Sequence, residues 1–178
     1  SDKYPTPAAR TEFFTRLADA GINVLEFNPV NPLDTVAAGW DVNERDHRKL
    51  LVVDGKVAFL GGINISIVYS GGSFRQSSKV RPDGTLPWRD TDLQIEGPAV
   101  TEVQKLFMET WEKQKGEPLA PRNYFPAPDP AGKEVVRIIG SSPDEPYSLI
   151  YATLISALRS AETEIWITNA YFVPDPQL

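Results

Sequence analysis

Cysteine is absent from the 178 residues, and histidine and methionine occur once each. Without cysteine the chain cannot build a disulfide framework, a thiolate nucleophile or a cysteine-ligated zinc site. A single histidine also excludes any site in which several imidazoles bind one metal ion. Long apolar runs are missing too. The most apolar stretch, residues 50–69, is interrupted by Asp54, Lys56 and glycines, so we do not expect it to span a membrane.

Positive charge is scarce as well. The chain has 18 lysines and arginines against 24 aspartates and glutamates, which gives a net charge of −6 at pH 7. Proteins that bind duplex nucleic acid usually present a basic surface to the phosphates, so no duplex nucleic acid is expected as a partner. Hydrophobic residues make up 41% of the chain, which is enough to form a packed core.

Helices and strands are predicted to alternate along the chain, which indicates a mixed α/β fold. Segments with apolar residues at helical spacing are predicted to be helices: 10–20, 98–111 and 147–160. Runs with high β propensity are predicted to be strands: 22–27, 93–95, 135–139 and 164–168. Two more such runs flank Asp54-Gly55, and an Asp-Gly pair in that position strongly favours a hairpin turn.

Proline is concentrated in one segment of the chain. Five of the 16 prolines lie between residues 117 and 130. Because proline fixes φ and lacks a backbone donor, we predict a stiff linker over residues 117–133. This linker would separate a first domain, residues 1–116, from residues 134–178. The strand–helix–strand pattern of the latter predicts the truncated start of a second domain.

The single histidine lies in a pattern that suits phosphate chemistry. His47 and Lys49 are two residues apart at the start of a predicted strand, so their side chains should leave the same face. A lysine neutralises phosphoryl oxygens, and an imidazole can attack phosphorus or move a proton. Asp54 lies roughly 20 Å further along and in the predicted turn, so geometry predicts a structural role for it. Two polar residues at a strand start would be the simpler interpretation of an isolated pair.

The spacing of these residues resembles a known signature. His47-x-Lys49-x4-Asp54, followed by Gly-Gly-x-Asn at 61–64, is similar to the HxKx4D motif region of the phospholipase D superfamily. Further stretches resemble its bacterial cardiolipin synthase-like members: WRDT at 88–91, GPAV at 97–100, Phe107, Trp111, Ser142-Pro143 and NAYFVPD at 169–175. The resemblance covers nearly the whole chain. It implies a phospholipase D-like fold, a mixed β-sheet flanked by helices.

The resemblance implies a role for each matched residue. His47 would be the nucleophile and would form a phosphohistidine intermediate with a phosphodiester substrate. Lys49 and Asn64 would hold the non-bridging phosphoryl oxygens and stabilise the charge that develops on them. Asp90 would orient the imidazole. The structural residues of the motif would be Asp54, Gly61 and Gly62. The scheme needs neither a metal ion nor another cofactor.

Active sites of this superfamily contain two HxKx4D motifs, one for the nucleophile and one for the general acid. This chain has one motif and no second histidine, so a second half is expected as a partner. It would come from the C-terminal part of a longer protein or from a second copy in a homodimer. We favour the longer protein, because a Pro-rich linker and second-domain residues follow the first motif.

The implied function is phosphodiester hydrolysis or phosphatidyl transfer on phospholipids, with water or an alcohol as acceptor. Association with a bacterial cell membrane follows from the same resemblance. Two alternatives stay open. One is a phosphodiesterase or nuclease that acts on non-lipid diesters, against which the acidic net charge argues mildly. The other is a non-catalytic module with half of a site, which the absence of a second histidine supports.

Overall fold

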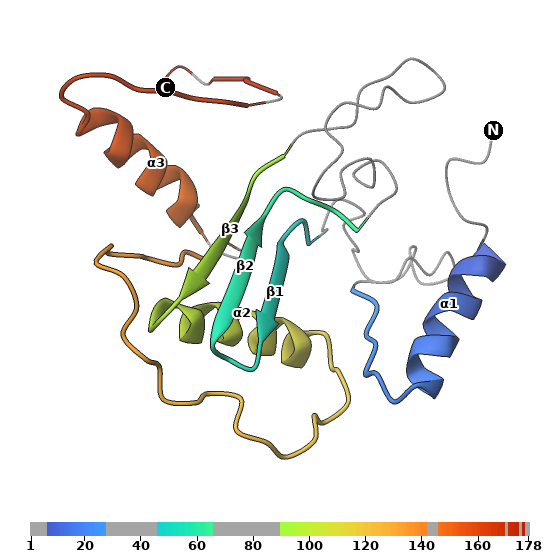
Figure 1. The fold of residues 1–178 in the computed structure, drawn as a ribbon. Helices are drawn as coiled ribbons and strands as arrows, with labels where there is room; N and C mark the ends of the chain where they lie inside the picture. Colours follow the sequence, from blue (N-terminus) through green and yellow to red (C-terminus); the bar gives the residue numbers. More distant parts are fainter. Residues whose placement is uncertain are drawn as a thin grey trace, which may run out of the picture. The chain divides into compact units, whose positions relative to one another are not determined.

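In a computed structural model of the chain, residues 7–27, 46–65, 90–141, 146–169, 171–174 and 176 are described. They form these helices and strands (Figure 1): α1 Pro7–Asp19, β1 Lys49–Val53, β2 Val57–Gly61, β3 Asp92–Glu96, α2 Ala99–Lys113 and α3 Leu149–Arg159. The chain divides into two compact units, residues 1–134 and 135–178. The predicted mixed α/β class is confirmed. The first unit contains the sheet, and the second contains α3.

The sheet is an antiparallel meander in the order β1-β2-β3. Its register places Lys49 opposite Gly61, and Gly61 opposite Asp92. Residues directly opposite each other on antiparallel strands project to the same face of a sheet. Lys49 and Asp92 therefore share a face, with Gly61 between them.

The turn between β1 and β2 is the one that the Asp-Gly pair predicts. Asp54 has a φ of 53° and Gly55 a φ of 66°, and the Lys56 N–H donates to the Val53 carbonyl at 3.0 Å. A type I′ turn requires positive φ at both central residues, and its twist matches that of the flanking strands. The predicted hairpin is confirmed.

Helix α2 covers one face of the sheet (Figure 1) and contacts all three strands. The row Val52, Ala58 and Ile95 lies on this face, and Ala58 is fully buried. Val100 and Val103, one turn apart on α2, are buried as well. The helical spacing predicted over residues 98–111 therefore produces the apolar face that the sheet requires. On the other face of the sheet, Leu51 is 57% exposed and Val53 43%.

The Pro-rich segment packs within the first unit. The indole Nε1 of Trp111 donates to the Glu117 carbonyl at 2.9 Å. The Tyr124 carbonyl and the Pro126 ring lie against Gly55 in the hairpin turn. The boundary between the two compact units follows Glu134. The division into domains 1–116 and 134–178 with a linker at 117–133 stays a prediction.

The predicted helices over residues 10–20 and 147–160 are confirmed by α1 and α3. At the start of α3, the Ser148 hydroxyl accepts a hydrogen bond from the Tyr151 N–H at 3.2 Å. None of the helices in the described ranges is long and apolar enough to cross a bilayer.

Three predicted strands are wrong. Residues 22–27, 135–139 and 164–168 form no strand. A strand is stabilised by hydrogen bonds to a neighbouring strand, and β propensity alone does not supply one. The exposure of these segments agrees with the lack of a neighbour, since Val135 is 99% and Trp166 87% exposed.

Gly55→Ala is expected to destabilise the first unit more than Gly132→Ala does. The two glycines have nearly the same positive φ, 66° and 67°, so an alanine meets the same backbone strain at each. A Cβ at Gly55 would also lie 2.6 Å from Pro126 Cδ and 2.8 Å from the Tyr124 carbonyl oxygen, whereas nothing lies within 4 Å at Gly132. The overpacking should add roughly 1–3 kcal/mol to the loss of unfolding free energy.

Equilibrium urea unfolding of the two variants and the unaltered chain measures this difference. Equal destabilisation by Gly55→Ala and Gly132→Ala would contradict the packing of the Pro-rich segment on the hairpin.

Candidate active site

The predicted site residues gather at one end of the sheet. His47 precedes β1 by two residues, Asn64 follows β2 by three, and Asp90 precedes β3 by two. Because the register aligns Lys49 with Gly61 and Gly61 with Asp92, these three strand ends lie side by side. The antiparallel topology thus brings together residues that lie up to 43 positions apart in the sequence, from position 47 to position 90.

Asp54 does not belong to this group. It lies in the hairpin turn at the opposite end of β1 from His47. Its position agrees with the geometric argument from the sequence, in which Asp54 is too distant along the strand to orient the imidazole.

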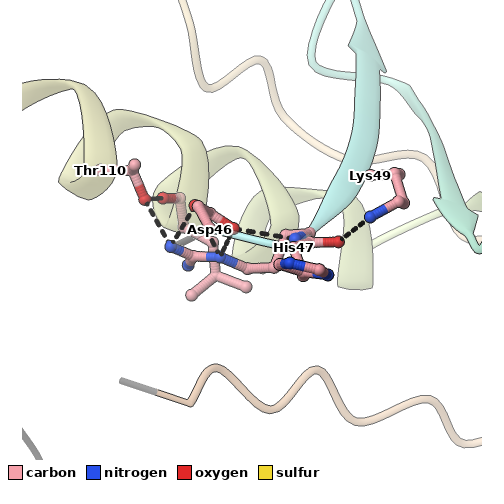
Figure 2. A network of polar contacts seen from close by, with 6 residues as sticks. Asp46, His47, Lys49 and Thr110 are labelled. Carbon is pink, nitrogen blue, oxygen red and sulfur yellow. Dashed lines mark hydrogen bonds and ion pairs between the residues drawn. The ribbon is translucent and has the colours of Figure 1, made fainter. Parts of the chain in front are cut away.

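His47 itself lies outside the hydrogen-bond ladder of the sheet, because β1 begins at Lys49. The residue is exposed, and within the described ranges no hydrogen bond to its imidazole is present. The Lys49 ammonium Nζ donates to the backbone carbonyl of His47 at 2.5 Å (Figure 2). The cation is thereby held beside the backbone of the residue predicted to be the nucleophile.

An ion pair that the sequence analysis missed spans His47. The Arg48 guanidinium donates to the Asp46 carboxylate from Nε at 2.9 Å and from Nη2 at 2.6 Å. The Arg48 backbone N–H also donates to Asp46 Oδ1 at 2.8 Å. The opposite charges that flank His47 in the sequence are the signal that could have predicted this pair.

The same guanidinium also forms a hydrogen bond with α2, the helix that covers one face of the sheet. Arg48 Nη2 donates to the Thr110 hydroxyl at 3.1 Å, and that hydroxyl donates to the Leu106 carbonyl at 2.8 Å. Figure 2 shows this network around Asp46, His47, Lys49 and Thr110. It connects the segment before β1 to α2, 62 residues later in the chain.

The charges around Asp46 alter its acidity. Partial burial alone would raise the pKa of its carboxyl group. Hydrogen bonds from the Arg48 side chain and backbone, together with the positive charges of Arg48 and Lys49, outweigh this and hold the pKa below its usual 3.8. Asp46 is therefore an anion at neutral pH, and its charge is neutralised locally by Arg48.

The two glycines at the end of β2, Gly61 and Gly62, provide space for two carboxylates. A Cβ on Gly61 would overlap Asp92, and one on Gly62 would overlap the Asp90 carboxylate. The Gly62 N–H donates to the Thr91 carbonyl at 3.2 Å, and the Ile63 N–H to Asp92 Oδ1 at 3.3 Å. At Gly61 only glycine permits this close approach, because a Cβ there would also overlap the Thr91 carbonyl oxygen and lie 2.6 Å from Asp92 Cα. At Gly62 the Cβ would meet the Asp90 carboxylate, which can rotate.

Some predicted interactions are not formed or cannot be placed. Asp90 Oδ1 accepts from the Thr91 N–H at 2.9 Å, and in the described part of the chain no hydrogen bond joins Asp90 to His47. The orienting role of Asp90 stays a prediction. Several residues of the resemblance lie outside the described ranges: Trp88, Arg89, Ser142, Pro143, Ala170 and Asp175. Among the described residues, no cluster of three or more histidines and carboxylates could bind a metal ion.

Known proteins provide an independent comparison. No family model matches the sequence, and no solved structure matches it. Curated relatives do match. Cardiolipin synthase 1 of Bacillus anthracis is 34% identical over 179 residues, which covers 94% of this chain and 32% of that protein. Cardiolipin synthase A of Pseudomonas fluorescens is 32% identical over 178 residues, which covers 98% of this chain and 33% of that protein.

This chain is a homologue of part of the bacterial cardiolipin synthases. A third relative, the cardiolipin synthase of Geobacillus kaustophilus, is 34% identical over 168 residues, 93% of this chain and 31% of that protein. The resemblance to cardiolipin synthases found in the sequence is therefore confirmed. The chain spans about one third of the length of these relatives.

Asp46→Asn is expected to destabilise the chain in a pH-dependent manner. A carboxyl group whose pKa is lower in the folded state stabilises that state above the unfolded pKa, and this stabilisation is lost as the pH falls through the folded pKa. The difference in unfolding free energy between the unaltered chain and Asp46→Asn should therefore be largest near pH 7. It should shrink below pH 3.8, the usual value of this carboxyl group.

Urea unfolding from pH 7 to about pH 2 measures this difference. Glu102→Gln is the matched control, because Glu102 forms an exposed pair with Lys105 at 2.7 Å on α2. Exposed pairs contribute little to stability, so its effect should be small. A difference for Asp46→Asn that does not change with pH would contradict the ion pair.

Proposed function

We propose that this chain forms one half of a phospholipase D-like active site that cleaves phosphodiester bonds of phospholipids through His47. The observation that carries the proposal is the convergence of His47, Asn64 and Asp90 at one end of the sheet, next to Lys49. The homology to proteins named cardiolipin synthase supports a phospholipid substrate. The phospholipase D-like fold is part of the same proposal.

The proposed reaction has two displacements at phosphorus. One imidazole nitrogen of His47 attacks the phosphorus, a P–N bond forms, and the P–O bond to the leaving alcohol breaks. The leaving oxygen takes a proton from a general acid. Water or another alcohol then attacks the phosphohistidine, the P–N bond breaks, and the acceptor loses its proton to the same group. Water gives hydrolysis, and an alcohol gives phosphatidyl transfer.

The neighbouring residues act on charge and orientation in this proposal. The Lys49 ammonium, held at the His47 carbonyl, lies where it can neutralise the non-bridging oxygens as negative charge builds on them. The Asn64 amide would donate to the same oxygens from the end of the Gly61-Gly62 segment. Asp90 would accept a hydrogen bond from the imidazole and stabilise its cationic form.

A second half of the site belongs to the proposal, because the general acid has no candidate imidazole in this chain, whose single histidine is the nucleophile. The second half would be a further part of a longer protein or a second copy of this chain. Association with a bacterial membrane, where phospholipid substrates lie, is part of the same proposal. The two experiments below distinguish this proposal from its two alternatives, a non-lipid diesterase and an inert module with half of a site.

His47→Ala is expected to abolish nitrophenolate release from bis(p-nitrophenyl) phosphate. Nitrophenolate is a good leaving group that hardly needs a general acid, so a half-site can complete the first displacement. The unaltered chain should release up to one nitrophenolate per chain in a burst, measured by its absorbance after rapid mixing.

Glu102→Gln, on the exposed surface of α2, is the control and should keep the burst. A burst that rises faster than linearly with protein concentration would support a site formed by two copies. No release from the unaltered chain would contradict the proposal and favour the inert module.

Phosphatidyl-p-nitrophenol in vesicles is expected to react at least about tenfold faster than the p-nitrophenyl ester of thymidine 5′-phosphate. The leaving group is the same in both, so the ratio of rates reports recognition of the lipid part. With ethanol present, mass spectrometry should detect phosphatidylethanol. Faster reaction of the nucleotide ester would contradict the lipid assignment and favour the non-lipid diesterase.

A further inference from the structure

We infer that Arg48 and Thr110 are positioning residues, which anchor the segment that carries His47 to α2. The inference rests on the proposed function for the role of His47 as nucleophile. The anchoring itself is a matter of hydrogen bonds among described residues, and it can be measured without any substrate.

The need for an anchor arises from the position of His47. β1 begins at Lys49, so residues 46–48 receive no support from the ladder of the sheet. A nucleophile displaced by about 1 Å can lose roughly 100-fold in rate, because attack requires the reacting atoms to be aligned. A catalytic residue just outside a sheet therefore depends on other contacts to hold its backbone.

The ion pair between Asp46 and Arg48 links the two residues that flank His47 in the sequence. Three guanidinium hydrogen bonds, two from Nε and one from Nη2, and one backbone hydrogen bond join the residues on either side of it. The Asp46 side chain is only 17% exposed, so the pair is partly protected from water. A bidentate arginine–carboxylate pair has a defined planar geometry, which restricts the residue between its partners.

One further hydrogen bond connects the Asp46–Arg48 ion pair to α2. Arg48 Nη2 donates to the Thr110 hydroxyl, which itself donates to the Leu106 carbonyl one turn earlier on α2. The hydroxyl is thereby fixed in direction, because its own proton is used within the helix. α2 is held in place by the buried Val100 and Val103. The backbone around His47 is therefore held in place relative to α2, the helix that packs on the sheet.

Lys49 adds a second restraint on the other side. Its ammonium donates to the His47 carbonyl at 2.5 Å. Because Lys49 is assigned to phosphoryl oxygens in the proposed reaction, this contact can be given up to the substrate. Arg48 is different, since its Nε and Nη2 donate to Asp46 and Thr110. We therefore place Arg48 outside the group of residues that bind substrate.

Nuclear magnetic resonance of the whole 178-residue chain tests the anchoring directly. The chain has a single histidine, so the Hδ2 and Hε1 resonances of its imidazole can be assigned to His47 without ambiguity. Arg48→Met and Thr110→Val should lower the heteronuclear NOE of the backbone amides of residues 46–48 and shift the imidazole resonance. Thr110→Ser keeps the hydroxyl and should preserve both. Glu102→Gln is the surface control.

Single-turnover kinetics with bis(p-nitrophenyl) phosphate test the positioning role. Arg48→Met and Thr110→Val should slow the burst roughly 10- to 100-fold with unchanged apparent affinity for the diester, and Thr110→Ser should restore the rate. Urea unfolding of each variant separates this effect from a general loss of stability.

Each result decides one claim. An unchanged NOE in Arg48→Met would overturn the anchoring, and lost order with an unchanged burst rate would overturn the positioning role. A weaker apparent affinity with an unchanged rate would overturn it too, because Arg48 would then bind substrate. No burst from the unaltered chain would instead count against the proposed function, and the NOE would still decide whether the segment is anchored.

Discussion

The register of the β1–β2 hairpin is the constraint on which the site depends. Successive residues of a strand project to opposite faces, so a slip of one residue would turn Lys49 toward α2 and Leu50 away from it. The turn at Asp54-Gly55 opposes such a slip, because it closes the hairpin with Val53 opposite Val57. His47 lies just beyond the far end of the same hairpin, two residues before β1 and seven before Asp54. The turn thus determines to which face Lys49 projects, although it lies at the opposite end of the strand.

Helix α2 has two functions in this arrangement. Its apolar face covers the row that contains Ala58, where a small side chain allows the helix to approach the sheet closely. Its Thr110 also provides the hydroxyl that Arg48 reaches. The helix that completes the core is therefore also the element to which the segment before β1 is hydrogen-bonded. A shift of α2 on the sheet would move Thr110, and with it the segment that contains His47.

Sequence patterns predicted the features that depend on neighbours close in the chain. The Asp-Gly turn and the amphipathic helix over residues 98–111 are of this kind, and so is the position of Asp54 away from His47. Strands at 22–27, 135–139 and 164–168 were wrongly predicted, because a strand needs a partner that local propensity does not reveal. The motif identified candidate residues, and the homology to cardiolipin synthases agrees with it.

Other features of the site depend on residues that are distant in the sequence. The bond from Arg48 to Thr110 spans 62 positions, and the one from the Ile63 N–H to the Asp92 carboxylate spans 29. The need for glycine at 61 has the same origin, because the atoms that a Cβ there would overlap belong to Thr91 and Asp92, 30 and 31 positions later in the chain. No pattern within a short window contains this information, and it becomes visible only when the three strand ends are placed together.

The charges at this end of the sheet give a physical reason for the second half that the proposed function requires. Among the described residues there, Arg48 and Lys49 are cationic, whereas Asp46, Asp90 and Asp92 carry carboxylates. Arg48 neutralises Asp46, and Asp90 would balance the charge that His47 acquires when it takes part in the reaction. Lys49 is then left to offset both Asp92 and the anionic diester. One lysine does not balance two negative charges, and the imbalance would cost most once a second half covers His47, Asp90 and Asp92, which are exposed in this chain. A second motif of the same kind would add a lysine as well as the general acid. In the proposed function, the second half would therefore contribute to substrate binding as well as to proton transfer.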